Sequence, residues 1–121
     1  MTDIEVLQAY RYAVAEVQAV SEQLEELQSL PRSGAEVRMA TMEAMLVSEQ
    51  ERLELIIRQF EQVVGQIRDP RTRMVIRQYY ALGYSDEKIG LVTGLSTRLV
   101  NKVRNRFLHD WAIVQEAHEI K

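Results

Sequence analysis

The sequence predicts an all-α protein in which a long helical hairpin is followed by a group of shorter helices. The 121 residues include only two prolines and five glycines, so the chain has few of the turn signals that an all-β protein needs. Apolar residues recur every three or four positions through the first half. Glycine-containing turns divide the second half into shorter segments. We therefore divide the chain into a helical hairpin, residues 1–68, and a C-terminal domain, residues 69–121.

The first predicted helix covers residues 2–29. Thr2 and Glu5 have the spacing of a capping box, in which a hydroxyl and a carboxylate satisfy the first free backbone N–H groups. Pro31 ends the helix, because proline lacks an N–H and disfavours helix in the residue before it. The apolar stripe consists of Ile4, Leu7, Tyr10, Val14, Val17, Val20, Leu24 and Leu27.

The second predicted helix covers residues 33–68, and Ser33 and Glu36 form a second capping-box pattern. Its apolar residues follow a heptad, which is typical of a coiled-coil-like helix. One seam position holds Met39, Leu46, Leu53, Phe60 and Ile67, and the other holds Met42, Glu49, Ile56 and Val63. We expect this stripe to pack against the first helix, and we expect the protein to form a homo-oligomer, with a dimer favoured.

The C-terminal domain is expected to begin at Asp69 and Pro70, because aspartate is a good N-cap and proline suits the first helical position. Three helices are predicted, at residues 71–82, 86–93 and 97–119. Gly83 and Gly94 fall in the turns between them, and glycine permits the left-handed backbone that a tight turn needs.

The last two of these helices have the spacing of a helix-turn-helix. Ser85 and Ser96 are expected to cap them. Ile89 and Val92 are expected to face inward, and Gly90 to let the two helices approach closely. The inward side chains that follow are Leu95, Val100, Val103 and Phe107.

Trp111 is the single tryptophan, and it continues the inward face of the last helix. We interpret it as packing against the hairpin of its own chain. The alternative is a contact with another protein.

Charge is unevenly distributed along the chain, whose net charge is −3. Residues 1–67 contain 12 acids and 5 bases, whereas residues 68–108 contain 9 bases and 3 acids. A basic block in an otherwise acidic protein is typical of a nucleic-acid-binding surface. A solvated basic surface that binds nothing explains the charge equally well.

The exposed face of the last helix offers side chains that can hydrogen bond to base edges in the major groove of double-stranded DNA. The expected base-reading residues are Thr97, Arg98, Asn101, Lys102 and Asn105. The expected phosphate contacts are Arg71, Arg73, Arg77, Ser85, Lys88, Ser96, Arg104 and Arg106. The agreement of caps, turn glycine, inward spacing and polar face favours DNA binding over an ordinary helix pair with a solvated basic face.

Residues 69–108 resemble region 4 of the sigma-70 factors. The matching segments are RMVIRQYY at residues 73–80, GYSDEKIG at residues 83–90 and GLSTRLV at residues 94–100. The whole chain is similar to small phage and prophage regulators of the RinA/ArpU type. This resemblance implies a sequence-specific transcriptional regulator that activates phage late or packaging genes, with RNA polymerase as a further partner.

In that resemblance, the promoter-reading positions correspond to Thr97, Arg98, Asn101 and Lys102. The sequence departs from the sigma pattern at several of these positions, so the sigma target sequence is not carried over. It also contains nothing that resembles the DNA-melting region of sigma factors. We therefore expect an activator or accessory DNA binder, and not a complete sigma factor.

The sequence contains no pattern typical of an enzyme. It has no cysteine, no glycine-rich phosphate loop and no nucleophile motif, and His109 and His118 are nine residues apart, which is not the spacing of a helical metal pair. We expect no enzymatic activity, no metal and no cofactor. An acidic N-terminus without a secretory signal, and apolar stretches interrupted by charge, predict a cytoplasmic protein with no membrane contact, located in a bacterial host cell if a phage encodes it.

Two other functions remain open. A phage terminase small subunit also combines a helix-turn-helix with helical oligomerisation elements, although its DNA-binding module usually comes first. A coiled-coil adaptor whose basic end binds protein is the other alternative, and it predicts no affinity for DNA.

Overall fold

The computed structural model describes residues 1–31 and 33–119, with side chains described as far as residue 114. Within this part of the chain there are five α-helices and no β-strand, so the predicted all-α class is confirmed. The helices are α1 (Asp3–Ser29), α2 (Glu36–Gly65), α3 (Pro70–Tyr80), α4 (Asp86–Thr93) and α5 (Thr97–Glu119). None of the described helices is long and apolar enough to cross a membrane.

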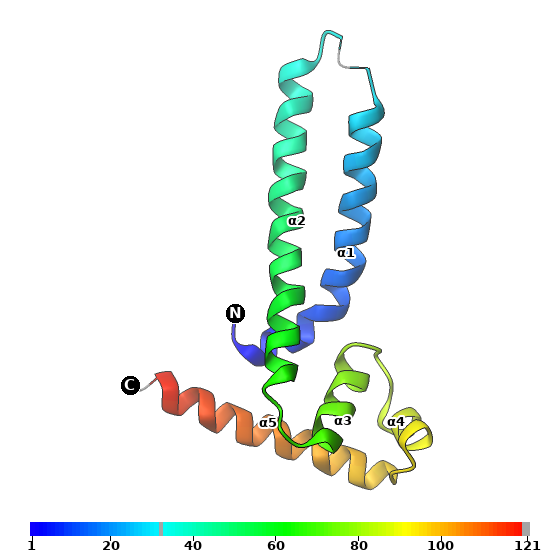
Figure 1. The fold of residues 1–121 in the computed structure, drawn as a ribbon, viewed down its shortest axis with the longest axis vertical. Helices are drawn as coiled ribbons and strands as arrows, with labels where there is room; N and C mark the ends of the chain where they lie inside the picture. Colours follow the sequence, from blue (N-terminus) through cyan, green and yellow to red (C-terminus); the bar gives the residue numbers. More distant parts are fainter. Residues whose placement is uncertain (32, 120–121) are drawn as a thin grey trace.

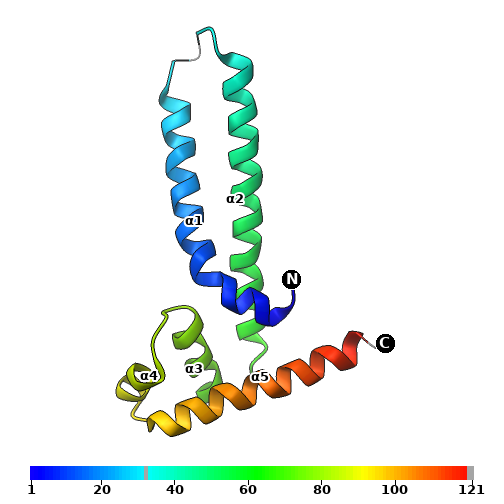
Figure 2. The ribbon, with the colours of Figure 1, turned by 180° about the vertical axis from the view of Figure 1, so that it is seen from behind.

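The two long helices α1 and α2 lie side by side, run in opposite directions and project from the other three helices (Figure 1). We call α1 and α2 the arm, and α3, α4 and α5 the three-helix module. In the view from behind, α5 lies across the base of the arm, next to the first turns of α1 (Figure 2). The arm therefore meets the module at one end and is free of it at the other.

The beginning of α1 agrees with the sequence. The Thr2 hydroxyl accepts a hydrogen bond from the Glu5 backbone N–H at 3.2 Å, and the Glu5 carboxylate accepts one from the Thr2 N–H at 3.5 Å. The predicted capping box is thus confirmed. The helix ends at Ser29, as expected from Pro31.

The beginning of α2 differs from the sequence-based expectation. The prediction that Ser33 and Glu36 form a capping box was wrong. The helix starts at Glu36, the residue before it is Ala35, and no side chain caps the helix. Gly34 has a left-handed φ of 83°, and its N–H donates to the Glu36 carboxylate at 3.3 Å. The chain therefore enters the helix too late for Ser33 to act as its cap.

The end of α2 also comes earlier than residue 68. Gln66 and Ile67 close the last turn with hydrogen bonds from their N–H groups to the carbonyls of Val63 and Val64, at 3.2 and 3.1 Å. The Arg73 guanidinium of α3 then donates to the Ile67 carbonyl at 2.9 Å. This side chain gives a hydrogen-bond partner to a backbone carbonyl just beyond the end of α2.

One hydrophobic cluster joins the base of the arm to the three-helix module. Phe60 of α2 is completely buried there and stacks on Tyr10 of α1, with 3.8 Å between the ring centroids. The buried members are Val6, Leu7, Phe60, Val63, Val64, Ile67, Ile76, Tyr80 and Phe107. These residues come from α1, α2, α3 and α5 and from the connection after α2, so the arm and the module bury apolar side chains against each other.

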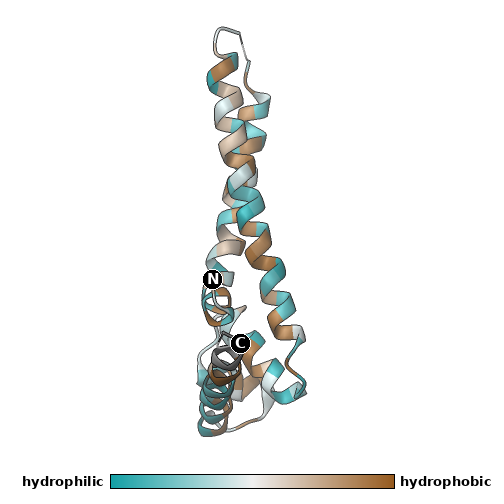
Figure 3. Cartoon of the chain, turned by 90° about the vertical axis from the view of Figure 1, so that its left-hand side faces the viewer, coloured by the Kyte–Doolittle hydropathy of each residue, from teal (hydrophilic) through white to brown (hydrophobic). Residues whose placement is uncertain are grey.

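The middle of the arm is held by a smaller cluster of Ala13, Leu53 and Ile56. The buried position on α1 is Ala13, whereas Val14, which the sequence placed on the stripe, is exposed. Bands of apolar and polar residues alternate along both helices (Figure 3). A small residue on α1 leaves room for the larger Leu53 and Ile56 on α2.

The free end of the arm is only partly packed. Met42, which the heptad placed in the seam, is exposed together with Met45. These side chains line an apolar groove of about 360 Å³, whose other lining residues are Gln23, Glu26, Leu27, Leu30 and Leu46. α1 still lies opposite at this level, since Gln23, Glu26 and Leu27 line the same groove, but its side chains leave Met42 and Met45 exposed.

Trp111 packs within its own chain, as the sequence predicted. Its ring lies 5.3 Å from that of Phe107, and both contact the cluster at the base of the arm. The indole N–H donates to the Asp3 carboxylate at 2.9 Å. This contact ties α5 to the first turn of α1.

Candidate nucleic-acid interface

The candidate site begins with the turn between α4 and α5. Ser85 caps α4 by accepting a hydrogen bond from the Lys88 N–H at 3.2 Å. Gly94 ends α4 with a left-handed φ of 79°, and its N–H donates to the Gly90 carbonyl at 2.9 Å. Ser96 then caps α5 by accepting from the Leu99 N–H at 3.1 Å. The residues that the sequence proposed as caps and turn glycine therefore fix where α5 begins.

The turn is tight because Gly90 has no side chain. A Cβ at this position would lie 2.7 Å from the Leu95 carbonyl oxygen, which is closer than real Cβ contacts allow. The Thr93 hydroxyl adds to the turn, since it donates to the Ile89 carbonyl at 2.7 Å and accepts from the Leu95 N–H at 3.3 Å.

A second cluster, formed by Val75, Ile89, Val100 and Val103, packs α3, α4 and α5 together. Ile89, Val100 and Val103 are buried as expected. Val92 is 56 % exposed, so its predicted inward position was wrong. Because α4 is only eight residues long, Ile89 and Gly90 are its only buried residues; Asp86 and Thr93 are partly buried, and the others are exposed.

The five expected base-reading residues are all exposed, and they lie on the first turns of α5. Thr97, Asn101 and Asn105 follow one another at intervals of four residues, and Arg98 and Lys102 form the neighbouring row. Spacings of four place side chains on the same face of a helix. The structure thus brings these five residues together on one surface.

The expected phosphate contacts separate into two groups. Arg71, Lys88 and Arg106 are exposed, and the Lys88 ammonium lies 5.3 Å from the centre of the Tyr84 ring. Arg106 is 3.8 Å from Asp110, a weak exposed pair. Ser85 and Ser96 are exposed and already act as caps.

Three other expected phosphate contacts are engaged within the chain. Arg77 of α3 forms an ion pair with Glu61 of α2 at 3.1 Å, and Arg73 binds the Ile67 carbonyl. Arg104 is only 15 % exposed, and its guanidinium lies 4.2 Å from the centre of the Tyr79 ring. Arg73, Arg77 and Arg104 thus hold parts of this protein together, and their contact with phosphate stays a prediction.

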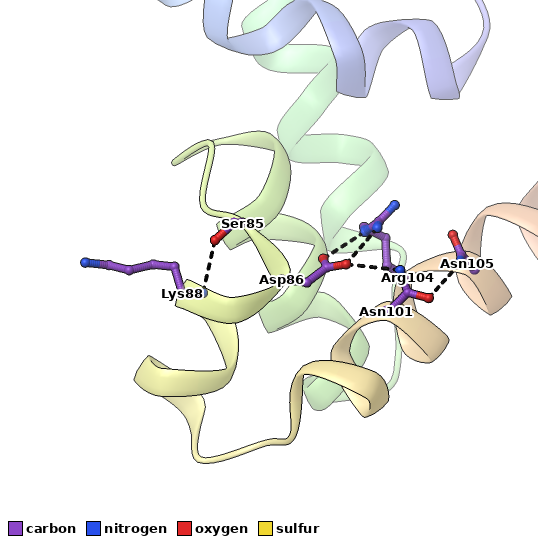
Figure 4. A network of polar contacts seen from close by, with 6 residues as sticks. All are labelled: Ser85, Asp86, Lys88, Asn101, Arg104 and Asn105. Atoms are coloured by element: carbon purple, nitrogen blue, oxygen red, sulfur yellow. Dashed lines mark hydrogen bonds and ion pairs between the residues drawn. The ribbon is translucent and has the colours of Figure 1, made fainter.

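The partner of Arg104 is Asp86, the first residue of α4. Its two carboxylate oxygens accept hydrogen bonds from Arg104 Nε at 3.2 Å and from Nη2 at 2.9 Å. The second oxygen also accepts from Asn101 Nδ2 at 3.1 Å, and Asn101 Oδ1 accepts from Asn105 Nδ2 at 3.1 Å. Figure 4 shows that these side chains form one connected network, whereas Lys88 points away from it.

This network keeps Asp86 ionised. The hydrogen bonds from Arg104 lower the pKa of the Asp86 carboxyl most; burial opposes them, and the hydrogen bond from Asn101 and the charge of Arg104 lower the pKa further. The same pairing raises the pKa of Arg104. Opposite charges in contact favour the charged form of both groups.

The role of Asp86 could not be recognised from the sequence. Asp86 and Arg104 lie on two different helices separated by a turn, so helical periodicity does not relate them, and Asp86 alone is typical of a favourable acid in the first turn of a helix. The contact of Tyr79 with Arg104 could not be recognised either, because in the sequence Tyr79 is only one residue of an apolar segment. The pair exists because α4 and α5 pack against each other.

The described residues contain no group of three or more His, Cys, Asp or Glu side chains that could hold a metal ion. Comparison of the chain with models of protein families, with curated proteins and with solved structures gave no match.

Proposed function

We propose that the chain is a sequence-specific DNA-binding transcriptional regulator in which α4 and α5 act as a helix-turn-helix. The observation that carries this proposal is the exposed polar face on the first turns of α5. Arginine, lysine and asparagine are the residues that form paired hydrogen bonds with base edges. An α-helix fits the major groove, and the N-terminal part of a recognition helix makes the base contacts.

Unpaired positive charge supports the same proposal. Within the described part of the chain, Arg71, Lys88, Arg98 and Lys102 are exposed cations without an ion pair to an acid. Cations that neutralise phosphates release counterions, so they supply affinity that falls as salt rises. In this proposal Arg71 and Lys88 contact phosphate, and Arg98 and Lys102 contact bases.

The arm supplies a protein contact in this proposal. We infer that it is a helical hairpin whose open apolar groove at the free end joins a second copy of the chain into a dimer. The resemblance to phage and prophage regulators of the RinA/ArpU type suggests the biological setting, activation of phage late or packaging genes in the cytoplasm of a bacterial host. RNA polymerase is the further partner that this setting suggests.

Selection of bound duplexes from a random pool, followed by affinity measurements across a salt series, tests the proposal. We expect one sequence class to be enriched and the affinity to fall steeply with salt, with a log–log slope of about −0.9 for each phosphate neutralised. A flat salt response and the absence of an enriched sequence would contradict DNA binding and favour a protein adaptor.

Two exposed arginines provide a matched pair of variants. Arg98→Ala, on the reading face of α5, should weaken binding to the selected site by about 1–3 kcal/mol and binding to a scrambled duplex much less. Arg71→Ala, on α3, should weaken both by a similar factor because phosphate contacts carry no sequence information. Titration of both duplexes at one fixed salt concentration measures the difference, and equal losses for the two variants would disprove the assignment of the reading face.

A further inference from the structure

The network at the start of α5 fixes how two carboxamides are oriented. We call Asp86, Asn101 and Asn105 the carboxamide relay (Figure 4). An ionised carboxylate only accepts hydrogen bonds, so the side of Asn101 that faces Asp86 must be its NH₂ group. Asn101 Oδ1 then faces the opposite way and accepts from Asn105 Nδ2. The polarity of Asp86 therefore sets the orientation of both amides.

The relay has a firm anchor at its inner end. Arg104 binds Asp86 through two parallel hydrogen bonds, and only 15 % of the Arg104 side chain and 17 % of the Asp86 side chain are exposed. Paired hydrogen bonds between guanidinium and carboxylate restrict the geometry of both partners. Tyr79 covers the guanidinium from α3, so three helices hold the carboxylate in place.

The outer end of the relay is open. Asn101 and Asn105 are both exposed, and Asn105 Oδ1 accepts no hydrogen bond from the described residues. Each amide also retains one N–H that is not used in the relay. The surface of α5 thus offers an acceptor and donors in a fixed order, which is the kind of pattern that discriminates between base edges in the major groove.

We propose that Asp86 is a specificity-determining residue that acts by positioning: it orients Asn101, and through it Asn105, toward the bases. Asp86 itself makes no contact with DNA in this mechanism. The inference rests on the proposed DNA-binding function and deepens it, because it assigns sequence preference to a residue outside the exposed face of α5. Without Asp86 the two amides are free to turn over and can offer donor and acceptor in either order.

Asp86→Asn is the direct test, because an amide at this position can present either an oxygen or an NH₂ group to Asn101 while keeping the same shape. The matched control is Glu87→Gln, which removes the same charge from the next residue of the same helical turn and lies outside the relay. For both variants and the unmodified protein, the ratio of affinities for the selected and the scrambled duplex is measured at one salt concentration. Base preferences are measured in parallel by selection from the random pool.

The inference predicts that Asp86→Asn lowers the affinity ratio by at least about fivefold, which corresponds to the loss of one good paired base contact. The base preference should become broader at the positions that the relay contacts. Glu87→Gln should leave the affinity ratio and the base preference unchanged. A merely structural role of Asp86 would lower both affinities equally and keep the ratio, and that result would overturn the inference while the proposed function stands. Absence of sequence preference in the unmodified protein would overturn both.

A second measurement keeps the inference testable if Asp86→Asn does not fold. Asn101→Ala and Asn105→Ala change only exposed side chains, and together with the double variant they form a double-mutant cycle. The relay predicts that the losses in the affinity ratio are strongly non-additive, because Asn105 loses its orientation once Asn101 is removed. Additive losses would overturn the inference.

Discussion

At the scale of single residues, the shape of the site depends on the absence of an atom at Gly90. The backbone of Leu95 approaches this glycine so closely that even a methyl group does not fit, and the approaching atom belongs to the main chain rather than to a flexible side chain. Gly94 adds the left-handed conformation that reverses the chain. Two glycines four residues apart therefore determine the direction in which α5 leaves the turn.

Gly90→Ala should destabilise the protein by about 1–3 kcal/mol, because the added methyl group forces α4 and the Leu95 carbonyl apart. Gly65→Ala is the matched control. Gly65 is the last residue of α2, its φ is not positive, and nothing lies within 4 Å of the position of the new Cβ. This control should stabilise the protein by about 0.5–1 kcal/mol. Urea unfolding compares the two variants, and a Gly90→Ala protein as stable as the parent would refute the close contact.

Asp86 predicts how stability depends on pH. Its pKa in the folded protein lies below the ordinary value of 3.8, chiefly because Arg104 donates hydrogen bonds to it. A carboxyl group with a lowered pKa contributes stability that is complete above the unfolded pKa and is lost as the pH falls through the folded one. Asp86→Asn should therefore destabilise the protein at neutral pH, and the difference should shrink in the acidic range below the unfolded pKa. Unfolding curves recorded for both proteins from neutral to acidic pH measure this, and a constant difference would contradict it.

At the scale of elements, the heptad of α2 is used unevenly along the arm. Leu53, Ile56, Phe60 and Val63 are buried, whereas Met42 is exposed in the groove that it shares with Gln23, Glu26 and Leu27 of α1. In proteins, packing of an amphipathic face and burial of apolar surface provide most of the stability of such helices. The middle and base of the arm should thus be the stable parts.

Two leucines on α2 test this view of the arm. Leu53 is 2 % exposed and Leu55 is 47 % exposed. Leu53→Asp should cost at least about 3 kcal/mol, because the leucine contacts are lost and a carboxylate has to enter an apolar environment. Leu55→Asp should change stability by no more than about 0.5 kcal/mol. Circular dichroism during thermal unfolding distinguishes the variants, and equal effects would mean that the two faces of α2 are not packed as described.

At the scale of the whole molecule, the arm and the three-helix module are joined by a shared core. The cluster around Phe60 contains residues from both, and the hydrogen bond from Trp111 to Asp3 spans 108 positions of the sequence. The expected division near residue 68 separates the chain into two regions of different pattern, but these regions bury apolar residues against each other. The orientation of the arm relative to α5 is therefore set by packing.

The apolar groove at the free end of the arm leads to a prediction about dimer formation. If the apolar groove joins two copies, Met45→Asp should weaken the dimer by about tenfold or more, because a charge then faces the apolar surface of the partner. Met45 is 68 % exposed, so the substitution should hardly affect the fold of a single chain. Sedimentation over a range of concentrations measures the association, with Leu55→Asp as an exposed control outside the groove. A parent protein that stays monomeric at high concentration would rule out the dimer.

The sequence by itself determined the elements that depend on local chemistry. The caps at Thr2, Asp69, Ser85 and Ser96, and the left-handed turn at Gly94, were predicted and are present. These features involve residues within four positions of one another, so their signal is visible in the order of residues. The same holds for the exposed face of α5, because helical periodicity alone separates it from Val100, Val103 and Phe107.

Only the tertiary structure decided which of those local possibilities was used. It exposed Val92 and Met42, buried Ala13 in place of Val14, and paired Arg104 with Asp86. Each of these outcomes depends on what a distant helix places opposite the residue. Helical periodicity shows which face of a helix is apolar, but it does not show how far a partner helix extends or which charge it brings. Sequence reasoning therefore could not predict the network of Asp86, Asn101, Asn105 and Arg104, because this network forms only where α4 and α5 meet.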